Sequence, residues 1–167
     1  MNTGQMMITL GALVLISFVV LRVNGSQLTV QDSMQNSKFG ILAISLATSI
    51  IENATEKAYD EKSTEDFLTS LSQLTARSSF GIEGGEDADS VHTFDDFDDF
   101  HSYSVVDTSM PSAHFQIDCA VNYVDPYSAN FITGNTMWHK MLTITITSPS
   151  MTDTVRMNKI YSYWKLP

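Results

Sequence analysis

The sequence is poor in cysteine and in basic residues, and each shortage excludes a class of protein. A single cysteine, Cys119, cannot form an internal disulfide, so the chain lacks the framework of a small disulfide-stapled scaffold. Nine Lys and Arg residues stand against 19 Asp and Glu residues, which gives a formal net charge of −10. Because phosphate binding relies on clustered Lys and Arg, we expect no nucleic acid partner.

Proline and charge are both missing from the N-terminal part of the chain. No proline occurs before Pro111, and no charged residue occurs before Arg22. The almost wholly apolar stretch from Met6 to Val23 would form a helix of about 27 Å, close to the roughly 30 Å hydrocarbon core of a bilayer. We therefore expect residues 5–25 to form a helix that inserts in a membrane.

Three interpretations of this N-terminal stretch compete. A cleaved secretory signal would begin with a basic residue and end at a small-x-small site, to which the Val23–Gly25 stretch is a poor match. An uncleaved signal anchor would keep its charged flank in the cytoplasm, yet Arg22 follows the apolar run. In the third interpretation, residues 1–4 are a very short leader that is removed after Gly4.

Residues 26–60 have the spacing of an amphipathic helix. Their apolar side chains recur at steps of three or four residues: Phe39, Leu42, Leu46 and Ile50. We expect this face to pack on a sheet, and the helix to continue from the membrane segment. A second, short helix is predicted over residues 63–78, with Ser63 and Asp66 spaced as a capping box and with Phe67 and several leucines on its buried side.

Over residues 113–167 the period of the apolar residues changes from helical to alternating, which predicts an antiparallel sheet. The pattern gives three strands, at residues 114–124, 137–147 and 154–164. Residues 103–106 would add an edge strand, so the sheet has three or four strands. The predicted fold class is therefore α+β, with a long N-terminal helix packed on a C-terminal antiparallel sheet.

Residues 81–112 form an acidic loop between the short helix and the sheet. Nine acids and no base lie between Glu83 and Asp107, and the rest of the chain is nearly neutral. Four of the acids are spaced so that their carboxylates can converge on one calcium ion: Asp95, Asp96, Asp98 and Asp99. Asp107 or a backbone carbonyl near Gly84 would complete the shell of oxygen ligands.

A second interpretation of the acidic loop needs no metal. Phe94, Phe97 and Phe100 are spaced by three, so they can pack on the sheet while the acids between them face water. Other chemistry has no recognisable pattern in the sequence. The histidines show no zinc spacing, and no Ser, His and acid set surrounds a nucleophile turn, so we expect a protein that is not an enzyme.

Gly4 and Gln5, placed directly before a long apolar helix, resemble the cleavage site of type IV pilins and type II secretion pseudopilins. The later order of an acidic Phe-Asp segment and alternating strands is similar to that of minor prepilins of the mannose-sensitive haemagglutinin type. This resemblance implies that a prepilin peptidase cuts after Gly4, leaving residues 5–25 as the transmembrane or filament-core helix and residues 26–167 as a pilin-like ectodomain. It also implies an inner-membrane, single-pass protein whose ectodomain lies outside the cytoplasm and reaches a filament or the cell surface after assembly.

Two positions depart from the pattern of that family. Gln5 stands where most pilins have Phe, and Thr9 stands where most have the Glu that pairs with a neighbouring subunit inside the filament. We therefore expect a structural minor pilin or pseudopilin subunit, whose partners are other pilin subunits and the membrane. The alternative is a secreted or membrane-anchored module for calcium binding or adhesion, outside any filament.

Overall fold

The computed structural model describes residues 2–64, 66–129 and 131–164. It contains one long helix, α1 (Thr3–Glu56), and an antiparallel sheet, which together give the expected α+β class. The strands are β1 (Ser104–Asp107), β2 (Phe115–Val124), β3 (Ile132–Thr133), β4 (His139–Thr147) and β5 (Val155–Ser162). The chain divides into two units, Met1–Lys38 and Phe39–Pro167, which are described separately.

The first unit is the N-terminal part of α1. Every large apolar side chain from Met6 to Val23 is exposed, and this helix is long and apolar enough to cross a membrane. The polar side chains within the stretch bond to the backbone of their own helix. Thr9 Oγ1 donates to the carbonyl of Met6 at 2.9 Å, and Ser17 Oγ donates to the carbonyl of Leu13 at 2.9 Å. Hydrogen bonds of this kind allow hydroxyl groups to reside in a hydrocarbon environment.

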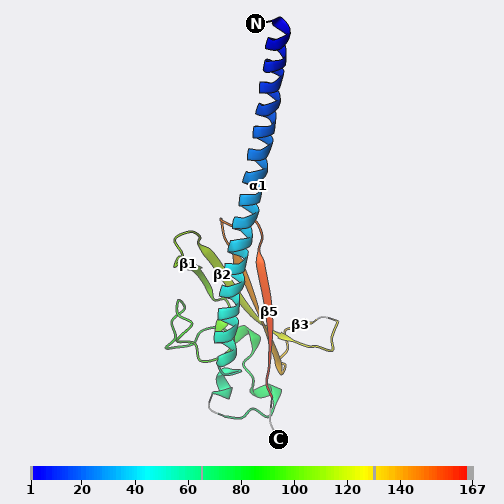
Figure 1. Ribbon diagram of the computed structural model, residues 1–167. Coiled ribbons are helices and arrows are strands. Elements are labelled where there is room, and N and C mark those ends of the chain that lie inside the picture. Colours follow the sequence, from blue (N-terminus) through cyan, green and yellow to red (C-terminus); the bar gives the residue numbers. More distant parts are fainter. Residues whose placement is uncertain (1, 65, 130, 165–167) are drawn as a thin grey trace. The chain divides into compact units, whose positions relative to one another are not determined.

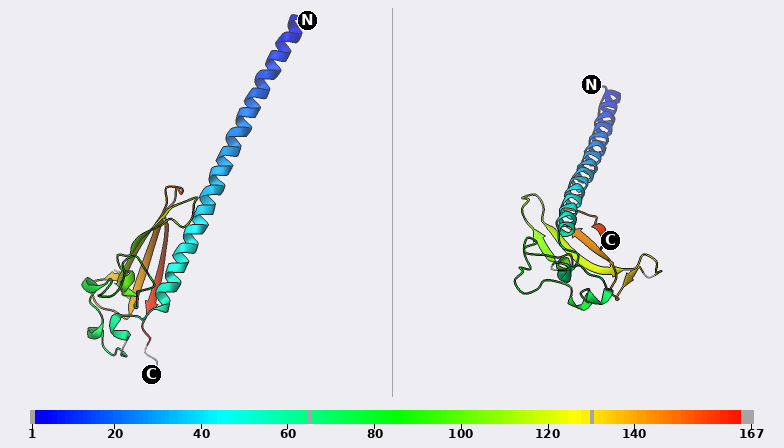
Figure 2. Two further views of the ribbon diagram at one scale, coloured as in Figure 1. Left: turned by 90° about the vertical axis from the view of Figure 1, so that its left-hand side faces the viewer. Right: turned by 90° about the horizontal axis from the view of Figure 1, so that it is seen from below.

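In the second unit, the C-terminal part of α1 lies along one face of the sheet (Figures 1 and 2, cyan). Its buried face consists mainly of small residues: Phe39, Ala43, Ala47, Ile50 and Ala54. Alanine brings the helix backbone close to the strands, so the larger Leu42 and Leu46 are only partly buried at the margins of the contact. The predicted face is thus confirmed at Phe39 and Ile50, and the alanines between them complete it.

The sheet has the strand order β1-β2-β4-β5, and all its pairings are antiparallel. Cross-strand pairs fill its inner face: Ile117 with Ile146, Cys119 with Ile144, and Val121 with Leu142. The three predicted strands and the edge strand are confirmed, with boundaries shifted by up to two residues. The two-residue β3, which pairs with the end of β2, was not expected because so short a strand has no periodicity.

The predicted helix over residues 63–78 is wrong. This region contains three single 3₁₀ turns, Glu61–Ser63, Leu71–Gln73 and Arg77–Ser79, while Glu65 lies outside the described residues. The capping box is made by Asp60 and Ser63 instead of Ser63 and Asp66. Serine, threonine and glutamine side chains bond to nearby backbone groups here and compete with helix formation.

Candidate functional site

The acidic segment, from Phe94 to His101, is buried where the sequence suggested solvation. Its three phenylalanines lie in the core, as expected for side chains that pack on the sheet. Three of its acids are buried as well, with exposed fractions of 1% for Asp96, 2% for Asp98 and 1% for Asp99. The expectation that the acids face water is therefore wrong for these three, and it holds for Asp95.

Two of the buried carboxylates bond to the backbone of the segment itself. Asp96 Oδ1 accepts hydrogen bonds from the amides of Asp98 (2.6 Å) and Asp99 (3.2 Å). Asp99 Oδ2 in turn accepts from the amides of Asp95 (3.0 Å) and Asp96 (2.9 Å). The bonds of Asp96 occupy the first two amides of the 3₁₀ turn Asp98–Phe100, and those of Asp99 occupy two amides just before it. The close spacing of the acids thus serves the turn.

The acidic segment is held against the chain that follows α1. The amide of Ala58 donates to the carbonyl of Asp95 at 3.1 Å, and the amide of Phe97 donates to the carbonyl of Ala58 at 3.0 Å. Lys57 Nζ adds a hydrogen bond to the carbonyl of Phe94. These bonds place Asp60, two residues beyond Ala58, next to the buried acids.

Lys140 enters this cluster from β4. Its side chain has no exposed surface, and its Nζ donates to the carbonyl of Tyr59 at 2.8 Å, to Asp60 Oδ2 at 2.9 Å and to Asp98 Oδ1. Three aromatic rings surround the nitrogen, with centroids at 4.7 Å for Tyr59, 5.0 Å for Phe80 and 5.7 Å for Tyr123. A buried lysine therefore joins the sheet, the acidic segment and the turn that follows α1.

The two acids that contact Lys140 differ in their other partners. Asp60 also accepts from the amide of Thr75 at 3.0 Å, from Thr75 Oγ1 at 3.0 Å and from the amide of Lys62 at 3.3 Å. This set of donors stabilises an ionised carboxylate. Asp98 lies beside the carboxyl group of Asp96. Asp96 Oδ2 is buried and has no hydrogen-bond partner among the described residues.

Asp96 and Asp98 can form a hydrogen bond only if one of them carries a proton. Burial and the neighbouring charge of Asp98 raise the pKa of Asp96 to about 9. Burial also raises the pKa of Asp98, although the nearby Lys140 opposes this effect and leaves it at about 6. Burial therefore favours the neutral form of Asp96 more strongly than that of Asp98, which has Lys140 as a counterion.

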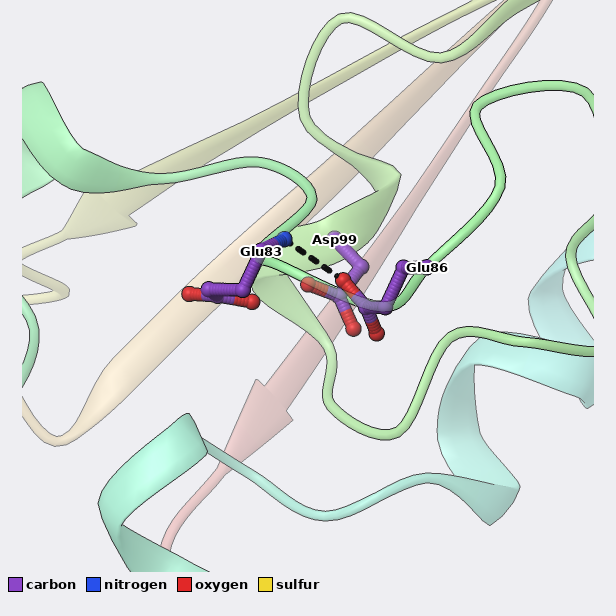
Figure 3. Close-up of side chains that lie close together, drawn as sticks. All are labelled: Glu83, Glu86 and Asp99. Atoms are coloured by element: carbon purple, nitrogen blue, oxygen red, sulfur yellow. Dashed lines mark hydrogen bonds between the residues drawn. The ribbon is translucent and has the colours of Figure 1, made fainter.

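A second group of carboxylates consists of Glu83, Glu86 and Asp99 (Figure 3). Oxygens of Glu83, Glu86 and Asp99 lie within 4.8 Å of one another, the one such group of three or more in the described part of the chain. Glu86 is fixed by the amide of Glu83, which donates to Oε2 at 2.7 Å, as the dashed line in Figure 3 marks. Burial raises the pKa of Asp99 to about 8 and raises that of Glu83, and the charge of Glu86 adds to both effects. A bound cation would offset the repulsion among these carboxylates and would compete with protons for their oxygens.

The four predicted calcium ligands are not brought together as one set. Asp99 joins Glu83 and Glu86, whereas Asp98 faces Lys140 and Asp96 faces the backbone of its own turn. Asp95 belongs to no such group. Of the residues expected to complete the shell, Asp107 accepts a hydrogen bond from the amide of Ser109 at 2.8 Å.

Lys140 and Asp60 are the members of the cluster that sequence reasoning missed. Lys140 has the same parity in β4 as Leu142, Ile144 and Ile146, which places it on the inner face of the sheet. It is also the only basic residue between Arg77 and Arg156. A single lysine at an inward position of a strand, in a stretch of sequence that includes the nine acids, could therefore have predicted a buried ion pair. Asp60 had a weaker signal, because only its capping box with Ser63 distinguishes it.

The other residues that the sequence singled out show no reactive chemistry. Burial and then the charge of Asp118 raise the pKa of the Cys119 thiol to about 12, so it is a small apolar side chain without thiolate character. His101 Nδ1 accepts a hydrogen bond from the amide of Val121 at 3.1 Å, and burial lowers its pKa. Gly4 and Gln5 both lie in the first turns of α1 and are exposed.

No family model, curated protein or solved structure matches this chain. Its function is therefore argued from its own residues. The arrangement offers three features with functional meaning: an apolar helix able to cross a membrane, a sheet packed on the continuation of that helix, and a buried lysine in contact with carboxyl groups.

Proposed function

We propose that this chain is a non-enzymatic minor pilin or pseudopilin subunit of a type IV pilus-like or type II secretion-like envelope assembly. The observation that carries the proposal is the dual character of α1. One continuous helix, Thr3–Glu56, has an apolar N-terminal part with every large side chain exposed and a C-terminal part whose alanines pack on a sheet. Exposed apolar surface of this extent requires a membrane or other apolar helices around it.

The proposed life of the subunit has two stages. In the first, residues 5–25 anchor it in the inner membrane, with the sheet domain outside the cytoplasm. In the second, a prepilin peptidase has removed residues 1–4, and the same helix packs against those of other subunits. Thr9 supports a minor role, because its hydroxyl bonds to its own helix and supplies no charge for a neighbouring subunit.

The mature N-terminus tests this proposal. The protein is extracted from membranes and its N-terminal peptide is identified by mass spectrometry, with Gly4→Leu as the variant that blocks processing. We expect a chain that begins at Gln5, and full-length chains in the variant. A chain that begins at Ser26 would instead identify a secreted soluble protein released by signal peptidase.

An uncut chain would support the second candidate, a membrane-anchored calcium-binding or adhesion module outside any filament. The observation in favour of that candidate is the convergence of Glu83, Glu86 and Asp99. The minor role has its own test, expression as the sole pilin in cells with working assembly machinery. We expect few filaments from the natural chain and more from Thr9→Glu, whereas abundant filaments of the natural chain alone would contradict a minor role.

A further inference from the structure

The cluster around Lys140 holds the two reactants of an amide condensation in contact. Lys140 Nζ is hydrogen-bonded to Asp98 Oδ1, and the exposed fractions of the two side chains are 0% and 2%. An amine and a carboxyl group condense to an amide with loss of one water molecule. In water the charged forms of both groups are strongly hydrated and do not react, whereas a buried site removes that hydration.

Asp98 is better suited than Asp60 to be the group attacked. The amide of Lys62 and two donors of Thr75 occupy both oxygens of Asp60 and fix its carboxyl group in place. It is a counterion that can also accept a proton from Lys140 at 2.9 Å. Asp98 accepts no such set of backbone donors, and its neighbour on the other side is the carboxyl group of Asp96.

Asp96 supplies the remaining requirement, a proton beside the carboxyl group that reacts. Its Oδ1 accepts hydrogen bonds from the amides of Asp98 and Asp99. Its Oδ2 is buried and has no hydrogen-bond partner among the described residues, so Oδ2 is the oxygen that can hold the proton. A neutral acid at this place polarises the carbonyl of Asp98 toward attack.

The aromatic rings close the site to water. Tyr59, Phe80 and Tyr123 lie around Lys140 Nζ, and both tyrosine hydroxyls are directed to backbone carbonyls, those of Met137 (3.0 Å) and Thr75 (2.7 Å). The apolar parts of the rings therefore face the lysine. Exclusion of water favours condensation and protects an amide from hydrolysis.

We propose that Lys140 and Asp98 form an intramolecular isopeptide bond, made by the folded chain itself with Asp96 as proton carrier. The Lys140 ammonium first passes a proton to the Asp98 carboxylate, which leaves a neutral amine and a neutral acid. The Nζ lone pair then attacks Cγ of Asp98 and forms the C–N bond. A second proton moves from the nitrogen through Asp96 to the departing hydroxyl, the C–O bond breaks, and water leaves. The net change is ammonium plus carboxylate to amide plus water, without an oxidant or a cofactor.

The bond would join β4 to the acidic segment across 42 residues of sequence. The acidic segment could then not separate from the sheet unless a covalent bond broke. The proposal concerns the folded ectodomain only, and it stands whether or not the chain assembles into a filament.

Trypsin digestion of the purified full-length chain tests the proposal. The sequence has no Lys or Arg between Arg77 and Lys140, and the next cleavage site after Lys140 is Arg156. An acylated lysine is not a trypsin site, so we expect one peptide of residues 78–156 whose mass is lower by one water. Separate peptides of residues 78–140 and 141–156 with unchanged mass would overturn the proposal.

A loss of water alone does not satisfy the test, because a succinimide at Asp98 has the same mass. A succinimide leaves Lys140 open to trypsin, so a dehydrated peptide that ends at Lys140 would also overturn the proposal. In the matched variant Lys140→Arg, which keeps the charge but forms no amide, we expect cleavage after residue 140 and the full mass.

Three further variants distinguish the roles of the acids. Asp98→Asn keeps a reactive carboxamide, so we expect the same crosslinked peptide formed with loss of ammonia, while Asp98→Ala gives none. Asp96→Asn keeps the shape but removes the transferable proton, and we expect the crosslinked fraction at a fixed time after synthesis to fall at least several-fold. A fully crosslinked Asp96→Asn chain, formed as quickly as the natural one, would remove Asp96 from the mechanism. The digestion of the natural chain gives a result even if a variant fails to fold.

Discussion

Lys140 Nζ lies 2.9 Å from Asp60 Oδ2, and neither side chain has any exposed surface. The two residues are 80 positions apart in the sequence, so their contact ties β4 to the turn that follows α1. Burying two charges costs about as much as their attraction returns, but removing one partner leaves the other uncompensated. The contact therefore makes the fold sensitive to the loss of either group.

Loss of the Lys140 side chain is expected to destabilise the sheet domain strongly. Lys140→Met removes the nitrogen that contacts both acids, whether it is an ammonium or an amide, and leaves Asp60 and Asp98 buried without their partner, which costs about 3–5 kcal/mol of unfolding free energy. Urea unfolding of the detergent-solubilised chain, followed by tryptophan fluorescence, measures this loss. The control is Lys159→Met, at an exposed position of β5, which we expect to change stability by less than about 0.5 kcal/mol. Equal effects of the two substitutions would contradict the buried cluster.

Stability is expected to fall as the pH rises. In the folded chain the pKa of Asp96 is raised to about 9 and that of Asp99 to about 8, above the unfolded value of about 3.9. The folded state thus binds more protons than the unfolded state, so the stabilisation is complete below about pH 4 and is lost as the pH approaches about 9. Each group contributes a slope of up to about 1.4 kcal/mol per pH unit.

Urea unfolding measured across this pH range checks the slope. Asp96→Asn should reduce it, because an amide does not titrate, whereas the exposed Asp66→Asn should keep it. A stability that rises with pH would show that the buried acids are ionised in the folded chain.

Calcium is expected to stabilise the sheet domain through Glu83, Glu86 and Asp99. At a fivefold excess over its Kd, binding raises the free energy of unfolding by about 1 kcal/mol, which calorimetry detects as a higher Tm. Asp99→Asn should abolish the rise, and Asp89→Asn, exposed on the same loop, should preserve it. If sodium chloride of equal ionic strength raises the Tm as much as calcium does, the group is not a calcium site.

The close contact between α1 and the sheet is expected to reject larger side chains. Ala47 has no exposed surface, so Ala47→Leu forces the helix away from the strands and costs about 1–3 kcal/mol. The control is Ile44, which is 48% exposed. Ile44→Ala should change the free energy of unfolding of the sheet domain by less than about 0.5 kcal/mol. The reverse order of effects in urea unfolding would place the wrong face of the helix against the sheet.

A charge in the N-terminal stretch is expected to weaken membrane insertion. Leu13→Lys places an ammonium near the middle of the apolar run, at a cost of about 2.5–3.5 kcal/mol. Alkaline carbonate extraction measures the fraction of chain that stays with the membrane. Leu28→Lys, beyond residue 25, should behave as the natural chain, and full retention of Leu13→Lys would argue against a spanning role for this stretch.

Periodicity made the large elements of the fold predictable. The alternation over residues 113–167 placed three strands, because all three are at least eight residues long and each has one face more buried than the other. It could not find β3, which is too short for a pattern. The helix face was predicted only in part, because alanine carries a weak apolar signal and the docking surface depends on it at Ala43, Ala47 and Ala54.

The candidate site was harder to predict because its members are distant in sequence. The acidic segment was recognised, but acids in a run are usually solvated, and nothing local shows that Asp98 meets a lysine 42 residues away. Only the inward parity of Lys140 in β4 indicated a buried cation. The turn hydrogen bonds of Asp96 and Asp99, by contrast, span two to four residues and are of the kind that short-range patterns can reveal.

The order of these residues along the chain also determines the stage of synthesis at which the sheet domain can fold. Synthesis proceeds from the N-terminus, so Asp60 and Asp98 are made well before Lys140. The local bonds of the acidic segment can form early, but its carboxylates must stay hydrated until β4 supplies their cation. Contacts of such long sequence separation close slowly. The arrival of β4 is therefore the event that allows the acidic segment to leave water, and a chain arrested before residue 140 should remain unfolded beyond α1.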